Sequence, residues 1–451
     1  MADERLGAAD NAEALRESLN ALSAEIGRRK RAGLPCDDLI QRHRQLSEQL
    51  RDVCRPQSAT AGRLVRERIA DLEADGVRES WDDLLERSDS ISPAMSWEWM
   101  HAWYSHFGRN HSISIEVVKE TGTNRWVGLL PIVRVCPWEV SWRFEGWLPC
   151  RHVAICGTRL GAEVDYTHPL IARDTDRAQI AELLVHSVEE AAMPFVANHW
   201  DWRNEAARLF VQRALEDGFT TISEPRAIAY HILPACFEEY VSQVPSQRRR
   251  SYIRSYTRRG WLEEGEFVLE IVQDPEGIIS HFPLLQAFSE AKYGRFSIWR
   301  LAHYRAFIES CVRSSASKGW PVLWLLKHRE EPVAASLGWL YKSACSITAM
   351  THDVTKRDLA PGHVLLSHII KQLIEHRVEL LDMHTAEGYK TQYLALRRMR
   401  MDPLILLPRQ GCGRTALAAA LLISGARKLA REAALALVRR RVSKTSHRGD
   451  E

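Results

Sequence analysis

The residues best suited to chemistry lie in one stretch, 352–390. A strand-like run ends in His352-Asp353, a polar loop 356–360 follows, and Pro361-Gly362 opens an apolar, helix-like run. Proline is tolerated in the first turn of a helix, because the N–H that it lacks would have no partner there. Glycine lets the main chain approach a ligand closely, and the free amides of a helix start carry partial positive charge. These features favour binding of an anion such as a pyrophosphate.

The loop and helix start resemble the coenzyme A loop of the N-acetyltransferase (GNAT) superfamily, which reads Gln/Arg-x-x-Gly-x-Gly/Ala. The matching residues are Arg357, Ala360, Pro361 and Gly362, with Ala360 in the place of the first glycine. The resemblance implies that these residues bind the pyrophosphate of an acyl-CoA co-substrate, and that no cofactor is tightly bound. A Pro-Gly helix start without any ligand is the alternative interpretation of the same six residues.

Further segments are similar to the CelD-like acyltransferases of cellulose and exopolysaccharide biosynthesis, which are related to the FemAB aminoacyl transferases. The similar segments are the arginine-rich run 247–254 with Gly260, the strand-like run 332–338, the helix start 360–362 and the ending 382–390. This resemblance implies an enzyme that moves an acyl group other than aminoacyl from acyl-CoA to an amine or hydroxyl of a polysaccharide or envelope precursor. Two alternatives stay open. One is FemAB-like aminoacyl transfer from charged tRNA, and the other is a non-catalytic adaptor of a polysaccharide machine.

Catalytic roles follow from the same resemblance. GNAT enzymes pass the acyl group directly from the thioester to the acceptor, so the site needs a base, donors for the oxyanion and an acid for the departing thiolate. Each candidate also has a structural interpretation, as a loop hydrogen bond, a solvated cation or a packed ring. The candidates are His352, Asp353 and Glu387 as bases, Lys390 as the stabilising cation, and Tyr389 or Tyr393 as the acid.

The arginine-rich run supplies candidates for substrate binding. Arg248, Arg249 and Arg254 recur at helical spacing. Guanidinium groups bind phosphates and carboxylates through paired hydrogen bonds. The run therefore suits a nucleotide-linked sugar, the coenzyme A phosphates or RNA, and a solvated helix face is the alternative.

Composition and the absence of certain motifs exclude several other classes of protein. The 451 residues are 45% hydrophobic and 26% charged, as in globular chains, and the net charge of +3 is too small to mark a nucleic-acid binder. The sequence contains no HExxH, no zinc-spaced Cys/His array, no Walker lysine and no Gly-x-Ser-x-Gly, so we expect no metal site and no serine hydrolase. Nine scattered cysteines without a CxxC pair indicate a reducing compartment.

The order of the helices and strands expected around these residues predicts an α/β (α+β) fold. Two stretches share one order, in which an antiparallel meander is followed by helix, strand and helix, so we expect two tandem GNAT-like lobes. An antiparallel helical hairpin precedes them. The expected units are a hairpin at 1–55, a linker at 56–79, an N-terminal lobe at 80–225, a C-terminal acetyltransferase lobe at 226–408, and a basic amphipathic helix and tail at 409–451.

The two ends of the chain suggest partners. The hairpin tip, Arg28–Arg31, is basic and could contact tRNA, or the hairpin could mediate a homodimer. In the tail, ten basic minus three acidic residues leave a charge of +7, which favours peripheral contact with an anionic membrane. The start of the chain has no signal-peptide core, and no apolar run reaches the roughly 20 residues of a span. We therefore expect a cytoplasmic protein, with possible contact at the inner membrane face.

Overall fold

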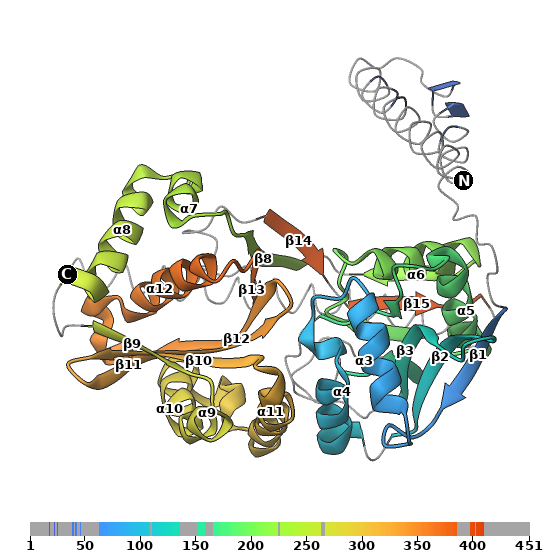
Figure 1. The fold of residues 1–451 in the computed structure, drawn as a ribbon, viewed down its shortest axis with the longest axis horizontal. Coiled ribbons are helices and arrows are strands. Elements are labelled where there is room, and N and C mark those ends of the chain that lie inside the picture. Colours follow the sequence, from blue (N-terminus) through green and yellow to red (C-terminus); the bar gives the residue numbers. More distant parts are fainter. Residues whose placement is uncertain are drawn as a thin grey trace, which may run out of the picture. The chain divides into compact units, whose positions relative to one another are not determined.

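A computed structural model of the chain describes residues 63–108, 111–135, 151–157, 166–223, 226–262, 267–385, 397–401 and 403–409, with eight single positions before residue 47 (Figure 1). Contacts divide the chain into two units, one of 1–63 with 174–176 and one of 64–173 with 177–451. The eight early positions are helical. The pairing of the predicted hairpin, its tip Arg28–Arg31 and the predicted C-terminal helix lie outside the described residues.

The first sheet belongs to the N-terminal lobe and runs in the order β1-β2-β3-β4-β6-β15-β7, with β5 pairing β3. Among the strand pairs that the structure describes in this sheet, only β4 and β6 are parallel. Helices α3 (Val77–Arg87), α4 (Trp97–Trp103), α5 (Arg177–Glu190) and α6 (Glu205–Glu216) accompany it. The strands are β1 (Leu64–Ile69), β2 (Ile113–Glu120), β3 (Trp126–Val135), β4 (His152–Ile155), β5 (Leu170–Ile171), β6 (Phe195–Asn198), β7 (Thr220–Ser223) and β15 (Pro403–Leu407).

The second sheet belongs to the C-terminal lobe and runs in the order β14-β8-β13-β12-β11-β10-β9. Its strands are β8 (Arg226–Ile232), β9 (Phe267–Val272), β10 (Pro321–His328), β11 (Glu331–Tyr341), β12 (Ala344–His352), β13 (Leu380–Thr385) and β14 (Arg397–Met401). Helices α8 (Gln247–Leu262) and α12 (Pro361–Glu375) cover one face, and α9 (Pro275–Ser280), α10 (Phe282–Tyr293) and α11 (Ala302–Ser315) cover the other (Figure 1). The short helix α7 (Phe237–Gln243) precedes α8. The expected mixed fold of two tandem α/β lobes is confirmed.

Two strands depart from the predicted division of the chain. β1 lies inside the stretch expected to be a linker. Its sequence, LVRERI, has three charged residues in a row and so did not indicate a strand that pairs with β2. β15 lies inside the stretch expected to belong to the C-terminal lobe, yet it pairs with β6 and β7 of the first sheet. Four of its residues, 404–407, are buried, as expected for a strand with neighbours on both sides.

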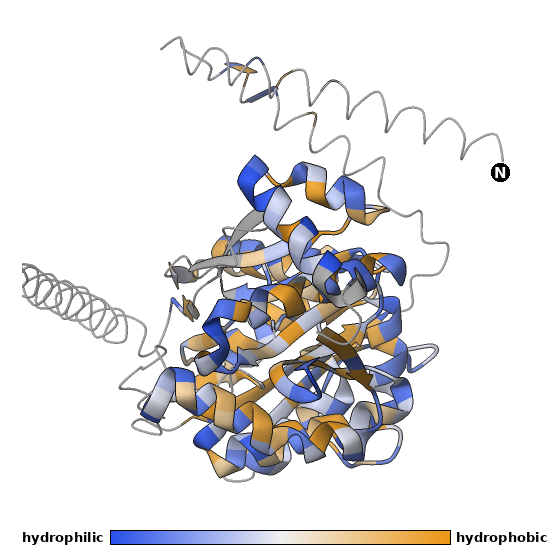
Figure 2. Ribbon diagram, turned by 90° about the vertical axis from the view of Figure 1, so that its left-hand side faces the viewer, coloured by the Kyte–Doolittle hydropathy of each residue, from blue (hydrophilic) through white to orange (hydrophobic). Residues whose placement is uncertain are grey.

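Apolar patterning explains how α12 is held. Its run PGHVLLSHIIKQLIE buries ten residues, and the seven aliphatic ones after His363 pack with strands β10 to β13 in one core. Hydrophobic residues follow the strands and the helix surfaces that face them (Figure 2). Among the helices that the structure describes, none is both long enough and apolar enough to span a membrane. The packing fixes the start of α12 at the end of the loop that follows β12.

Candidate active site

The second sheet opens between its two parallel strands. β12 and β13 pair from Ala344–Leu380 to Ser346–Asp382, whereas β12 continues six residues further, to His352. The register of β13 against β8 also shifts between Asp382 and Thr385. Beyond Ser346, the described residues of the two strands do not pair with each other.

His384 lies at this opening with unusual geometry. Its φ is +60°, a left-handed value within a strand, and such strain concentrates at functional sites. Its Nε2 lies 3.0 Å from Ser346 Oγ, and its ring stacks on Tyr166 with a centroid distance of 5.7 Å. The Ser346 hydroxyl and the Tyr166 ring thus hold the imidazole at the end of the strand pairing.

The turn into α12 is built as the sequence predicts. Ala360 caps the helix with φ 51° and ψ 44°, a left-handed conformation that favours glycine. Pro361 occupies the first helical turn. The first backbone hydrogen bonds run from His363 N and Val364 N to Ala360 O, so the amide of Gly362 has no acceptor in the described part of the chain.

His352 lies directly against this turn. A Cβ added to Gly362 would stand 3.1 Å from His352 Nδ1, so a larger residue would fit only if the ring shifted by a few tenths of an ångström. Burial lowers the pKa of His352 below its usual range, and the positive charges of Lys292 and Arg357 lower it further. The imidazole is therefore uncharged near neutral pH, beside two cations and a free amide.

Asp353 stabilises the loop that follows β12. Its carboxylate accepts hydrogen bonds from the amide of Thr355 at 2.8 Å and from the Thr355 hydroxyl at 2.7 Å, capping the 3-10 helix η6 (Val354–Leu359). Burial opposes ionisation of Asp353, but these bonds and the charges of Lys356 and His352 hold its pKa below the usual range. A carboxylate that stays ionised is a weak base, and its catalytic role stays a prediction.

Helix α8 contacts the start of α12 through stacked rings. Tyr256 stacks on His363, with centroids 5.8 Å apart and an interplanar angle of 11°, and on Tyr252 at 6.2 Å. The guanidinium of Arg248 lies 5.5 Å from the Tyr252 ring, and its Nε donates to the Tyr252 hydroxyl at 2.9 Å. This ladder, defined as Arg248, Tyr252, Tyr256 and His363, extends from the arginine-rich end of α8 to the predicted pyrophosphate turn.

The charge of α8 is not balanced within the helix. Its 16 residues include six arginines and no acid. Arg254 lies 3.5 Å from the exposed Glu238, whereas Arg248 and Arg249 have no carboxylate within 4 Å among the residues described. Two of the three predicted substrate-binding arginines are therefore available to an anionic ligand.

A buried ionic network joins the two lobes beside the opening. Arg203 donates to Asp201 at 2.8 Å and to Asp382 at 2.6 Å. Tyr166 donates through its hydroxyl to Asp382 at 2.8 Å, and the guanidinium of Arg203 lies 4.3 Å from the Tyr166 ring. The other Asp382 contact is the amide of His384, at 2.8 Å. The network thus fixes the end of β13.

In this network, the opposite charges of Arg203 and its carboxylate partners outweigh the cost of burying them. Burial opposes ionisation of Asp201, but the charge and hydrogen bonds of Arg203 outweigh it and hold the pKa of Asp201 below its usual range. Burial likewise opposes the charge on Arg203, and the two carboxylates outweigh it and raise the Arg203 pKa. The sequence analysis missed Arg203 and Tyr166, because no local motif marks a contact between residues that lie 179 or 216 positions apart.

The structure thus places His352, Arg357, Ala360, Pro361 and Gly362 around one turn, with α8 beside it. Four predicted catalytic residues, Glu387, Tyr389, Lys390 and Tyr393, lie outside the described residues. In the part that the structure describes, no group of three His, Cys, Asp or Glu side chains is placed to hold a metal ion.

Comparisons with known proteins agree with this geometry. Residues 247–391 match the family model of the acetyltransferase (GNAT) domain, so the chain contains such a domain. That match supports transfer of acyl or aminoacyl groups in general. No protein with a curated description matches the chain.

Several solved structures are similar to this chain over about three quarters of its length. The crystal structure of FemX shares 11% identity, covers 75% of this chain and 96% of its own, and superposes with a TM-score of 0.53, which shows a shared fold. A conserved protein of unknown function from Bacteroides thetaiotaomicron shares 11% identity and covers 74% of this chain and 98% of its own, with a TM-score of 0.47. A tandem GNAT protein from the clavulanic acid biosynthesis pathway shares 12% identity over 76% of this chain and 98% of its own, with a TM-score of 0.41.

Proposed function

We propose that this protein is an acyltransferase that moves an acyl group from acyl-CoA to an amine or hydroxyl of a polysaccharide or envelope precursor, as in the CelD-like group. The observation that carries the proposal is the turn at Gly362. There the Gly362 amide has no acceptor among the described residues, and Tyr256 of α8 stacks on His363. The positive charges of Lys292 and Arg357 act on His352 at the same turn. A nucleotide diphosphate combines the two chemistries that this place offers, anion binding and ring stacking.

The two ends of the donor would occupy different places. Ser346 and His352 are six residues apart on β12, about 20 Å at the strand rise. The long pantetheine arm of coenzyme A separates its diphosphate from its thioester in the same way. If the diphosphate lies at Gly362, the thioester lies toward the opening at Ser346, and His352 serves the diphosphate end.

This placement changes which group we propose as the base. His384, which touches Ser346, would take the proton of the acceptor amine or hydroxyl as its nitrogen or oxygen attacks the thioester carbonyl. The thiolate of coenzyme A then leaves and takes up a proton. Asp382 would act as a positioning residue, because it holds the His384 amide and is itself held by Arg203.

The test uses the purified full-length protein. Mass spectrometry of retained small molecules, followed by an assay for released coenzyme A thiol over a panel of amines and sugar nucleotides, should detect acyl-CoA and its turnover. His384→Ala should lower turnover while leaving coenzyme A binding intact. Absence of both coenzyme A binding and thiol release across the panel would remove the proposal.

A second candidate is aminoacyl transfer from charged tRNA. The observation that favours it is the acid-free arginine helix α8, where Arg248 and Tyr252 of the ladder are exposed, since basic surfaces with stacking rings also suit RNA. Copurification of tRNA, and its loss when Arg28–Arg31 are neutralised, would decide for this candidate. Peripheral contact of the basic tail with an anionic membrane is compatible with either donor.

A further inference from the structure

A tyrosine of the N-terminal lobe contacts His384 at two points. The Tyr166 ring stacks on the His384 ring, with centroids 5.7 Å apart and an interplanar angle of 9°. The Tyr166 hydroxyl donates to Asp382 Oδ1 at 2.8 Å, and the amide of His384 donates to the same oxygen at 2.8 Å. Tyr166 therefore touches the imidazole directly and shares with its main chain one carboxylate oxygen.

Tyr166 is itself held firmly by its own lobe. It is 2% exposed, and its carbonyl accepts a hydrogen bond from the Ser92 hydroxyl at 2.7 Å. The guanidinium of Arg203 lies 4.3 Å from the centroid of the Tyr166 ring. His384, by contrast, is only partly buried. The buried ring can therefore serve as a fixed support for the more accessible one, because packing on several sides holds it in place.

The main chain of His384 requires such support. A left-handed φ of +60° in a residue with a Cβ persists only where the surrounding structure imposes it. The amide bond to Asp382 lies within β13, but Asp382 is held in turn by Tyr166 and Arg203, which both belong to the N-terminal lobe. In its own lobe the imidazole contacts the Ser346 hydroxyl at 3.0 Å. The strained residue is thus supported from both lobes.

A second left-handed histidine lies beside the same contact. β6 follows α5 in the first lobe as β13 follows α12 in the second, and each of the two strands pairs in parallel with an earlier strand of its sheet. His199 comes directly after β6, has a φ of +55°, and accepts a hydrogen bond at its carbonyl from the amide of Thr167 at 3.0 Å. Burial and the charge of His384 lower the pKa of His199 to about 4. Backbone strain therefore recurs where the two lobes meet, as is common at functional sites.

We propose that Tyr166 is a positioning residue of the active site, whose ring and hydroxyl hold His384 in place, so that the site is complete only when both lobes are present. The inference rests on the proposed function, in which His384 takes the proton of the acceptor. Tyr166 lies outside residues 247–391, which match the acetyltransferase domain, so this support comes from outside the matched domain. A misplacement of about 1 Å can cost roughly a hundredfold in rate, so a residue that touches no substrate can control turnover.

Steady-state kinetics of the full-length protein tests this role. Tyr166→Leu removes the ring and the hydroxyl, so kcat for release of coenzyme A thiol should fall by about tenfold or more. KM for acyl-CoA should change little, because the proposed diphosphate turn lies at Gly362. Tyr230→Leu is the matched control. Tyr230 is also buried and its ring lies 5.6 Å from the Arg203 guanidinium, but the hydroxyl that Asp382 accepts is that of Tyr166. Wild-type kcat in Tyr166→Leu, or an equal loss in Tyr230→Leu, overturns the inference.

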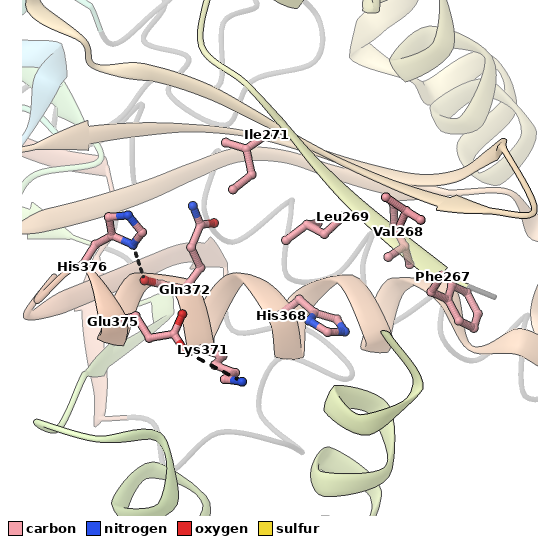
Figure 3. A pocket seen from close by; sticks show the side chains of 10 residues that line it. Phe267, Val268, Leu269, Ile271, His368, Lys371, Gln372, Glu375 and His376 are labelled. Atoms are coloured by element: carbon pink, nitrogen blue, oxygen red, sulfur yellow. Dashed lines mark hydrogen bonds and ion pairs between the residues drawn. The ribbon is translucent and has the colours of Figure 1, made fainter. Parts of the chain in front are cut away.

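Nuclear magnetic resonance of the free protein tests the contact without any substrate. The histidine rings are isotope-labelled, and the His384 signal is identified by its loss in His384→Gln. The ring-current shift of this signal should disappear in Tyr166→Leu and persist in Tyr166→Phe. His376 is the internal reference, because it lines a groove between β9 and α12 that contains no residue of the contact (Figure 3). An unchanged His384 signal in Tyr166→Leu, or an equal shift at His376, overturns the positioning role.

Tyr166→Phe covers the case in which Tyr166→Leu does not fold. It keeps the stacked ring and removes only the hydrogen bond to Asp382, so kcat should fall by about threefold or more. Wild-type kcat in Tyr166→Phe, with an unchanged amide signal of His384, overturns the inference. The wild type separates the two claims. If it releases no thiol, the proposed function fails and this inference with it, whereas full turnover by the wild type and by both Tyr166 variants removes the inference alone.

Discussion

His352 and Gly362 compete for one space, since the Cβ that Gly362 lacks would lie 3.1 Å from His352 Nδ1. The ring of the last β12 residue thus packs on the first turn of α12 and fixes the distance between strand and helix. A side chain at position 362 would require the imidazole or the helix start to shift by a few tenths of an ångström. The geometry of the turn that we propose to bind the diphosphate therefore depends on this pair.

Gly362→Val should destabilise the protein by about 1–3 kcal/mol, the usual cost of overpacking. Replacing the imidazole in the double variant Gly362→Val, His352→Ala should recover part of that loss, because the added methyl groups then have room. Urea unfolding of the four proteins measures the coupling. Gly122→Val is the control, since a Cβ there meets nothing within 4 Å. Additive effects of the two substitutions would contradict the contact.

Ala360→Gly should raise stability by up to roughly 1 kcal/mol. The left-handed backbone at Ala360 penalises any Cβ, and glycine removes that penalty at some entropic cost. Ala306→Gly, inside helix α11, should instead lower stability by roughly 0.5–1 kcal/mol. Equal losses for both variants in urea unfolding would show that position 360 is not strained.

Arg203→Met should be among the most damaging single changes. It leaves two buried carboxylates, Asp201 and Asp382, without their cation, at a cost of about 3–5 kcal/mol. Neutralising both acids in the same chain, with Asp201→Asn and Asp382→Asn, should restore much of the stability. The exposed Arg313 provides the control, and Arg313→Met should change the urea midpoint little. A mild effect of Arg203→Met would contradict the network.

Acid should weaken the same network. Because the pKa of Asp201 is lower in the folded protein than its ordinary value of about 4, its contribution is complete above that value and is lost as the pH falls further. Asp201→Asn should therefore flatten the dependence of unfolding free energy on pH below about pH 4. Parallel acid-unfolding curves for the variant and the wild type would exclude an ionised Asp201.

Local patterns in the sequence predict much of the C-terminal lobe. The apolar run after Pro361 predicts a helix at 362–376, and α12 spans Pro361–Glu375. The strand-like run 344–351 corresponds to β12, Ala344–His352. Both elements have uninterrupted apolar periodicity and clear ends, so their identity depends on residues close in the chain.

Long-range relationships could not be predicted in this way. The pairing of β15 with β6 and β7 joins segments about 200 residues apart, and nothing in PLILL indicates which sheet it enters. The bridge from Arg203 to Asp382 likewise depends on how the lobes meet. A base at His384, in place of His352, becomes a hypothesis only once the end of the β12–β13 pairing is known.

Neutralising the arginine end of the ladder should weaken donor binding. Arg248→Gln with Arg249→Gln removes two charges that no described carboxylate balances, so coenzyme A affinity and its salt dependence should both fall. The exposed Arg313 again offers a control, because its carboxylate partners already compensate it. If the double variant Arg248→Gln, Arg249→Gln binds coenzyme A as the wild type does, α8 plays no part in donor binding.

Calorimetric titration of coenzyme A into the wild type and into Gly362→Val tests the central claim most directly. The account predicts saturable binding of one coenzyme A per chain by the wild type, and binding lost or at least tenfold weaker in the variant while Gly122→Val binds normally. Wild-type protein that binds no coenzyme A, or Gly362→Val that binds it with unchanged affinity, would contradict the assignment of this turn.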